Sequence, residues 1–132
     1  MNKLVCSMAT GLGIDSAAML AMAAGNAVLD VMLEPGFLAR VEAMGRLLRG
    51  RLADLVATYP KLFAELRGAG LLLGIRCVVP AADFVTRLRE NGLLTLTAGE
   101  NVLRILPPLV VTEAEIGEAV GIIDKVASIW PA

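Results

Sequence analysis

The chain contains no histidine. Its 132 residues offer no imidazole to activate a serine or cysteine nucleophile or to bind zinc. Serine–histidine and cysteine–histidine catalytic sites, and the common zinc sites, are therefore excluded for this chain. No residue is assigned to metal binding.

Cysteine and lysine are scarce. Cys6 and Cys77 are the only thiols, and neither has a cysteine or histidine at metal-ligand spacing. A reducing cytoplasmic environment is expected from this pattern. The only lysines are Lys3, Lys61 and Lys125, and the sequence around each is typical of a solvent-exposed side chain.

Neither sign of charge is in excess. The chain has 12 basic and 13 acidic residues, a net charge of -1 and no run of basic residues. Nucleic acids and anionic membrane surfaces require clustered positive charge, so neither partner is expected. Asn26 and Asp30 interrupt the apolar stretch 17–33, so a membrane span is not predicted there. Asp15 interrupts the apolar core that a signal peptide would need.

The apolar residues, by contrast, are abundant. They make up 57% of the chain, enough for a core without disulfides. A first helix is expected from Asp15 or Ser16 to about Leu33; it is apolar on nearly every face and is expected to be largely buried. Residues 34–36, Glu-Pro-Gly, end it. A second helix is expected over 37–57, with apolar residues at three- and four-residue steps.

Shorter elements are expected after Tyr59-Pro60. The sequence Thr112-Glu113-Ala114-Glu115 is a capping box that opens a last helix, with Trp130 near its end. The remaining expected elements are a helical turn at 61–65, a strand at 71–79, a helix at 81–90 and a hairpin with strands at 93–97 and 102–106.

This order of elements predicts an α+β fold. It consists of a small sheet of about three to four strands covered by helices and preceded by two long helices. No repeat or interdomain linker is evident.

Arg104 stands in the otherwise apolar strand 102–106. Alternation places it on one face with Val102 and Leu106, and both faces are mostly apolar, so both are expected to be covered. A guanidinium cannot lose its charge, and a buried one needs a partner. One interpretation is a structural arginine whose head reaches water or Glu100. The other is an anion-binding residue that faces a ligand carboxylate or phosphate. The pattern by itself leaves both open.

Several segments together carry a resemblance to a known family. They are LAMAAGNAVLDVMLEPGFL (20–38), RGAGLLLGIRC (67–77) and NGLLTLTAGENVLRILPPLVVTEAEI (91–116). The chain resembles the C-terminal part of class-III pyridoxal-phosphate-dependent aminotransferases, and within that class the acetylornithine aminotransferases. The resemblance covers residues 20–130, and LRILPPL followed by TEAEI is its most specific part.

The resemblance implies fold-type I enzymes that are dimers, with a large domain carrying the cofactor lysine and a small C-terminal domain. It implies amino-acid and 2-oxo-acid substrates, N-acetylornithine and 2-oxoglutarate among them, and a place in arginine biosynthesis. The arginine before the Leu-Pro-Pro segment binds the substrate's α-carboxylate in the family, which implies that role for Arg104. No other residue of this chain is assigned to substrate, cofactor or catalysis.

The chain also departs from the family. No lysine lies in the glycine-rich context of the cofactor lysine, and the aspartate that faces the pyridine nitrogen belongs to a preceding region. A Gly-Gly-Asn-Pro segment that contacts the cofactor phosphate is replaced by residues 13–19, where Asp15 would repel a phosphate. Residues 1–19 are therefore interpreted as a divergent, truncated or frame-altered segment, and 20–132 as the small domain with its leading helix.

Two functions of different class follow. The first is an acetylornithine aminotransferase-like protein that is truncated, binds no pyridoxal phosphate alone and is not catalytically competent by itself. The second is a stand-alone module that binds small carboxylates or self-associates through the apolar helix 15–33.

Overall fold

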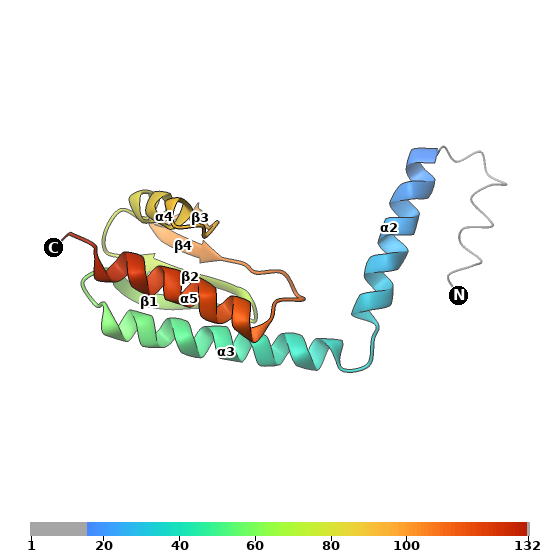
Figure 1. Cartoon of the computed structure of the whole chain (residues 1–132), viewed down its shortest axis with the longest axis horizontal. Helices are drawn as coiled ribbons and strands as arrows, with labels where there is room; N and C mark the ends of the chain where they lie inside the picture. Colours follow the sequence, from blue (N-terminus) through green and yellow to red (C-terminus); the bar gives the residue numbers. More distant parts are fainter. Residues whose placement is uncertain (1–15, 132) are drawn as a thin grey trace. The chain divides into compact units, whose positions relative to one another are not determined.

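The computed structural model describes residues 16–131, so Lys3, Cys6 and Asp15 lie outside the described residues. The chain divides into two compact units, residues 1–39 and 40–132. The first contains helix α2 (Ser16–Met32), and helix α3 (Phe37–Thr58) begins in it. Both long helices confirm the expectation from the sequence (Figure 1).

Helix α2 is largely exposed, which corrects the expectation that it is buried. Leu20, Val28 and Leu29 are exposed to 73%, 58% and 51%. Along the described part of α2 most side chains are exposed and none is buried. No single helix within residues 16–131 is long and apolar enough to cross a membrane, although α2 and α3 pass such a test as a broken pair by length and composition alone.

The second unit is a sheet with helices on one face. Its strands are β1 (Phe63–Ala69), β2 (Leu72–Cys77), β3 (Leu96–Ala98) and β4 (Val102–Ile105). They are antiparallel and lie in the order β1-β2-β4-β3. With helices α4 (Ala81–Glu90) and α5 (Glu113–Ser128), the fold is α+β with a four-stranded sheet, as the sequence predicts.

The prediction of a helical turn at 61–65 is wrong, because β1 begins at Phe63. The sequence pattern did not predict β1 as a strand, because its outward positions carry the charged residues Glu65 and Arg67. Gly68 makes the hairpin to β2 possible: its φ is +112°, and a Cβ there would lie 2.2 Å from the carbonyl oxygen of Leu72. The strand expected at 93–97 is likewise shifted to β3, which starts at Leu96.

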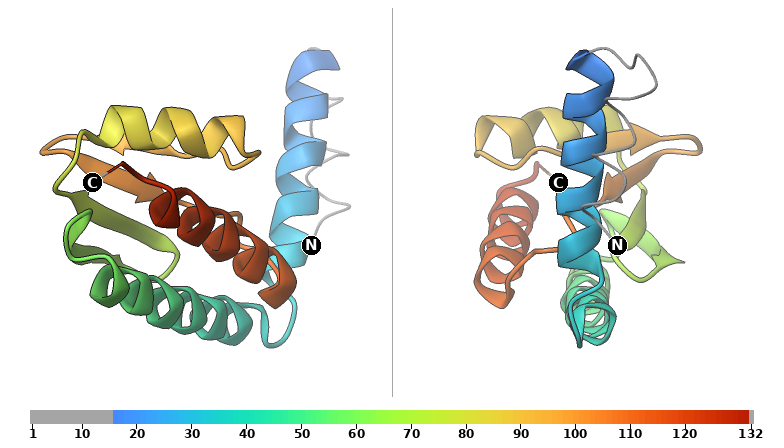
Figure 2. Two further views of the ribbon diagram at one scale, coloured as in Figure 1. Left: turned by 60° about the vertical axis from the view of Figure 1, so that its left-hand side comes forward. Right: turned by 90° about the vertical axis from the view of Figure 1, so that its right-hand side faces the viewer.

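The core lies between the sheet and its helices (Figure 2). Alternate residues of the strands point into it, and α4 and α5 contribute their apolar faces. The side chains with the least exposure include Phe63, Leu73, Ile75, Phe84, Leu88, Leu103, Ile116, Ile123 and Val126.

The opposite face of the sheet is open, which corrects the expectation that both faces are covered. Leu72 on β2 is 52% exposed and Leu96 on β3 is 66% exposed, and Arg104 is exposed beside them. The expectation was wrong because alternation shows which residues share a face but not whether another element covers that face.

Candidate functional site

Arg104 lies on β4 and points to the open face of the sheet. Its neighbours Leu103 and Ile105 are 0% and 8% exposed and face the core. Successive side chains of a strand point to opposite faces. Because Leu103 and Ile105 are buried, the side chain of Arg104 points outward. The alternation predicted from the sequence is confirmed at these three positions.

A row of register partners crosses the open face at Arg104. Arg67 on β1 pairs with Gly74 on β2, Gly74 pairs with Arg104, and Arg104 pairs with Leu96 on β3. The two arginines are therefore two strands apart, about 10 Å at ordinary strand spacing. Gly74 separates them without a side chain, and a Cβ there would meet Cγ1 of Val102 at 2.7 Å.

This row forms one side of a shallow hollow on the open face. Its volume is about 190 Å³, and it is lined by Arg67, Gly68, Leu72, Leu73, Gly74, Ala98, Val102 and Arg104. Both guanidinium side chains line it together with apolar ones. The hollow has the size of a small anionic group and the donors to bind one.

Glu100 does not pair with Arg104, so the structural interpretation of Arg104 keeps its first alternative, a head exposed to solvent, and loses only the pairing with Glu100. Glu100 lies 3.2 Å from Arg67, which also pairs with Glu65, and Glu65 lies 3.5 Å from Arg76. Hydrogen bonding from Arg67 holds the pKa of the Glu65 carboxyl below its usual value. The ion pair with Glu65 in turn raises the pKa of Arg67.

Arg104 takes part in none of the ion pairs formed among residues 16–131. Its charge on an exposed strand is compatible with solvent, so the fold does not require a protein partner for it. Of the three arginines on the outer face of the sheet, Arg104 is therefore the one whose donors are free for a ligand within the described chain.

Asn101 places the turn between β3 and β4 beside α4. Its side-chain oxygen accepts a hydrogen bond from the Ala81 backbone N–H at 2.7 Å, and its amide donates to the carbonyls of Cys77 and Val79, both at 2.8 Å. Its φ of 64° is the left-handed conformation that asparagine tolerates. Sequence reasoning identified the turn but missed these bonds, since they join residues 20 to 24 positions apart.

The described residues do not fit a pyridoxal phosphate site. That cofactor is held by a lysine, and the lysines of the described chain, Lys61 and Lys125, are exposed and do not line the hollow of Arg104. Residues 16–131 also contain no group of three or more acidic or cysteine side chains that could bind a metal ion.

The described residues form an α+β domain with an open sheet face that carries an arginine without an ion pair. Comparison with known proteins identifies the family: the class-III aminotransferase model matches residues 15–127. The chain belongs to the class-III aminotransferases.

Curated relatives carry the name acetylornithine aminotransferase. The proteins of that name from Bradyrhizobium diazoefficiens and Bacillus subtilis are 53% and 48% identical over 106 and 103 residues, which are 80% and 77% of this chain. The aligned region is 26% of each relative. The chain thus spans about a quarter of the length of the relatives it matches.

A solved structure shows the same fold. The crystal structure of acetylornithine aminotransferase from Elizabethkingia anophelis aligns with a TM-score of 0.77 and 33% identity, covering 85% of this chain and 29% of that one. The resemblance stated from the sequence is confirmed. The boundary between residues 1–19 and 20–132, and the role of Arg104, stay predictions.

Proposed function

We propose that this chain supplies the carboxylate-binding part of an acetylornithine aminotransferase-like enzyme, with Arg104 as the residue that binds the substrate carboxylate. The observation that carries the proposal is the unpaired guanidinium of Arg104 on the open sheet face, beside the hollow that Gly74 leaves next to it. A planar guanidinium can donate two parallel hydrogen bonds to a carboxylate.

The full reaction needs more than this chain. Transfer of an amino group between N-acetylornithine and 2-oxoglutarate uses pyridoxal phosphate, which supplies the electron sink for that chemistry when bound. The described residues do not fit that group, and we propose that the chain alone is not catalytically competent. As the setting in which the domain acts we propose a cytoplasmic, dimeric enzyme of arginine biosynthesis, which is what the resemblance to the family implies.

A chimaera tests the role of Arg104. Residues 20–132 replace the aligned quarter of the Bacillus subtilis acetylornithine aminotransferase, and transamination of N-acetylornithine with 2-oxoglutarate is measured. Arg104→Gln is expected to lower kcat/KM about 100-fold, since charge-assisted hydrogen bonds to the carboxylate are lost.

The matched control is Arg51→Gln, which removes an exposed arginine of α3 outside the hollow. It is expected to leave kcat/KM within about twofold of the parent. An active chimaera whose kcat/KM is insensitive to Arg104→Gln would refute the role of Arg104. A correctly folded chimaera without activity would refute the proposal for the domain.

The lysines give a second test. The isolated chain is mixed with pyridoxal phosphate, reduced with borohydride and analysed by peptide mass spectrometry. We expect no lysine to be labelled stoichiometrically, because Lys61 and Lys125 are exposed amines that do not line the hollow of Arg104. One lysine labelled to completion would show that the chain forms a cofactor site by itself.

Self-association is a second candidate function, favoured by the exposed apolar surface of α2. Six large apolar residues there or just after it are exposed: Leu20, Val28, Leu29, Val31, Met32 and Leu33. A surface of this kind is typical of an interface. Light scattering after gel filtration is expected to give a dimer that Leu29→Glu dissociates and the control Leu94→Glu, 82% exposed outside α2, does not. A monomeric parent chain would contradict this function.

A further inference from the structure

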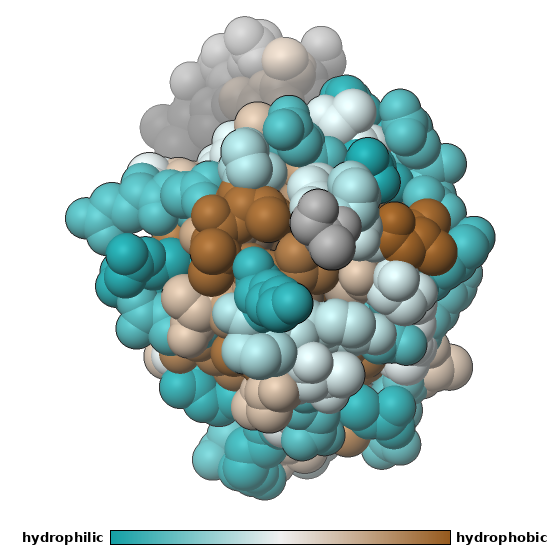
Figure 3. All heavy atoms as spheres, turned by 90° about the vertical axis from the view of Figure 1, so that its left-hand side faces the viewer, coloured by the Kyte–Doolittle hydropathy of each residue, from teal (hydrophilic) through white to brown (hydrophobic). Residues whose placement is uncertain are grey.

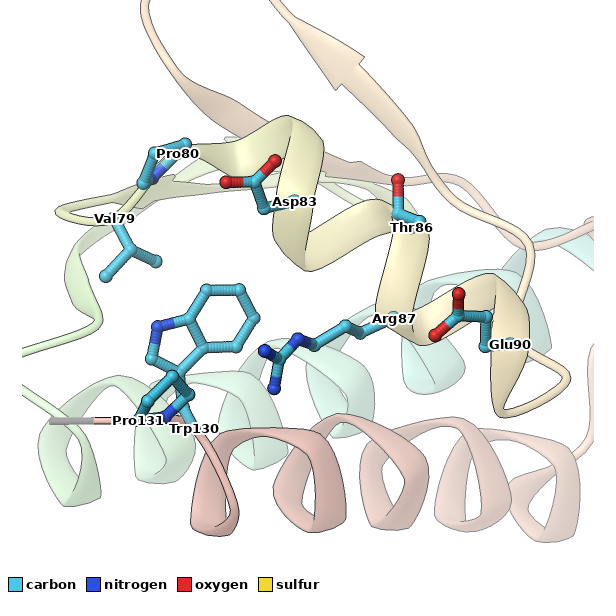
Figure 4. Close-up of a pocket in the computed structure, with 8 residues that line it drawn as sticks. All are labelled: Val79, Pro80, Asp83, Thr86, Arg87, Glu90, Trp130 and Pro131. Carbon is cyan, nitrogen blue, oxygen red and sulfur yellow. The ribbon is translucent and has the colours of Figure 1, made fainter.

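A hollow lies between α4 and the segment that follows α5. Its volume is about 520 Å³, within the range of small-molecule sites. Asp83, Thr86, Arg87 and Glu90 line it, and their spacing along α4 places them on one face of the helix. Val79 and Pro80 line it just before α4 begins, and Trp130 and Pro131 lie across from the helix (Figure 4).

Trp130 holds Arg87 in position within this pocket. The guanidinium carbon of Arg87 lies 4.6 Å from the centroid of the indole, an ordinary cation–π distance. The indole also packs on Phe84, with centroids 5.0 Å apart and ring planes inclined at 34°. Since Phe84 is 0% exposed, the core fixes the indole, and the indole orients the guanidinium.

The guanidinium of Arg87 has free donors. Asp83 is four residues before it and Glu90 three residues after it, yet neither forms an ion pair with it, and no ion pair formed within residues 16–131 includes Arg87. Figure 4 shows the Arg87 side chain running from α4 to the indole, with Asp83 and Glu90 on either side along the helix. Stacking on Trp130 replaces the usual i,i+4 pairing on a helix surface.

The pocket therefore presents one cation, two anions and an apolar wall. A ligand that is only anionic would be attracted by Arg87 and repelled by Asp83 and Glu90. A ligand that is only cationic would be repelled by Arg87 and attracted by the two carboxylates. A molecule that carries both charges a few bonds apart, with an apolar group, satisfies all three features. Figure 3 shows the side that faces left in Figure 1, where hydrophilic residues surround a group of apolar ones.

We infer that this pocket binds a free apolar amino acid as a zwitterion. Its carboxylate accepts hydrogen bonds from Arg87, its ammonium lies toward Asp83 or Glu90, and its side chain packs on Trp130 and Val79. The pocket is built from α4 and the end of the chain, whereas Arg104 points to the open face of the sheet. The inference goes beyond the proposed function and does not depend on it.

Fluorescence provides a direct assay, because Trp130 is the only tryptophan of the chain. The full chain is titrated with L-leucine, and with 4-methylpentanoate and 3-methylbutylamine, which keep only the carboxylate or only the amine. L-leucine is expected to give a saturable change and to bind at least about tenfold more tightly than either analogue. Equal affinities, or no saturable change with L-leucine up to about 10 mM, would overturn the inference.

Variants identify the charges involved. Arg87→Gln is expected to weaken L-leucine binding about tenfold or more, while Arg89→Gln, an exposed arginine of the same helix outside the pocket, binds as the parent does. Equal binding by Arg87→Gln and Arg89→Gln would refute the site.

The double variant Asp83→Asn/Glu90→Gln gives a readout that a folding defect cannot mimic. It should weaken binding of L-leucine and of 3-methylbutylamine but strengthen binding of 4-methylpentanoate, since the repulsion of a carboxylate is removed. A parallel loss for all three ligands would refute the charge assignment. Arg104→Gln should leave L-leucine binding unchanged, so the result is independent of the carboxylate role proposed for Arg104.

Discussion

Gly74 on β2 is the cross-strand partner of Arg104 on β4, and no side chain stands between Arg104 and Arg67 on the next strand but one. The absence of a Cβ at Gly74 opens the hollow on the sheet face. It also accommodates Val102, whose Cγ1 would lie 2.7 Å from that Cβ. Gly74 thus leaves room for the Val102 side chain and for the hollow beside Arg104.

Gly74→Ala should destabilise the chain through Val102. The added methyl group forces the Val102 side chain off its rotamer, at a cost of about 0.5–1.5 kcal/mol in the free energy of unfolding. In a Val102→Ala background the same substitution should cost nothing measurable, because the clashing atom is gone. A double-mutant cycle by urea unfolding checks this. Additive effects of the two substitutions would contradict the contact.

The two faces of the sheet should respond differently to truncation. Leu103→Ala removes a side chain that is 0% exposed and should cost about 2–5 kcal/mol of unfolding free energy. Leu96→Ala removes a side chain of the outer face, at the register position opposite Arg104, that is 66% exposed and should stay within about 0.5 kcal/mol. Chemical denaturation of both variants provides the measurement. Similar losses would mean that the outer face is covered in solution.

The free energy of unfolding should fall when the side-chain amide of Asn101 is lost. Asn101→Asp keeps the shape and the acceptor for the Ala81 N–H, but it places a carboxylate oxygen against the carbonyls of Cys77 and Val79. We expect a loss of about 1–3 kcal/mol at neutral pH, because a donor is replaced by a repelled acceptor.

The neighbouring Glu100→Gln is the control for Asn101. It removes only an exposed ion pair with Arg67 and should cost less than about 1 kcal/mol. Thermal unfolding of the two variants distinguishes a bonding role of Asn101 from general sensitivity of the turn. If the two variants melt at the same temperature, the bonds of Asn101 add nothing to stability.

Glu115 should make stability depend on pH in the acidic range. Hydrogen bonds from the hydroxyl and backbone N–H of Thr112 hold the pKa of the Glu115 carboxyl below its ordinary value of 4.5. A lowered folded-state pKa contributes stability that is present above pH 4.5 and is lost as the pH falls through the folded pKa.

Glu115→Gln keeps the capping-box geometry but does not titrate. The difference in unfolding free energy between the parent and this variant should therefore shrink as the pH falls below about 4.5. Urea denaturation at a series of pH values from 7 to 3 measures it. A difference that is constant over this range would show that the carboxylate of Glu115 does not contribute through its charge.

The sequence by itself determined the features that depend on local pattern. Three- and four-residue spacing marked α3, the capping box marked the start of α5, and alternation placed Arg104 opposite to Leu103 and Ile105. These features are set by neighbours along one helix or strand, so a single segment contains the information. The segments quoted from the sequence also carried the resemblance to class-III aminotransferases, which the comparisons confirm.

The tertiary structure decided which partners meet. It paired Glu100 with Arg67 and left Arg104 without an ion pair within the described chain, and it brought Arg87 to Trp130 in place of its helix neighbours. It also made β1 a strand, since pairing with β2 outweighs the weak local pattern of a charged segment. Coulomb and hydrogen-bond energies depend on distances between segments, and those distances exist only after the sheet and its helices have packed.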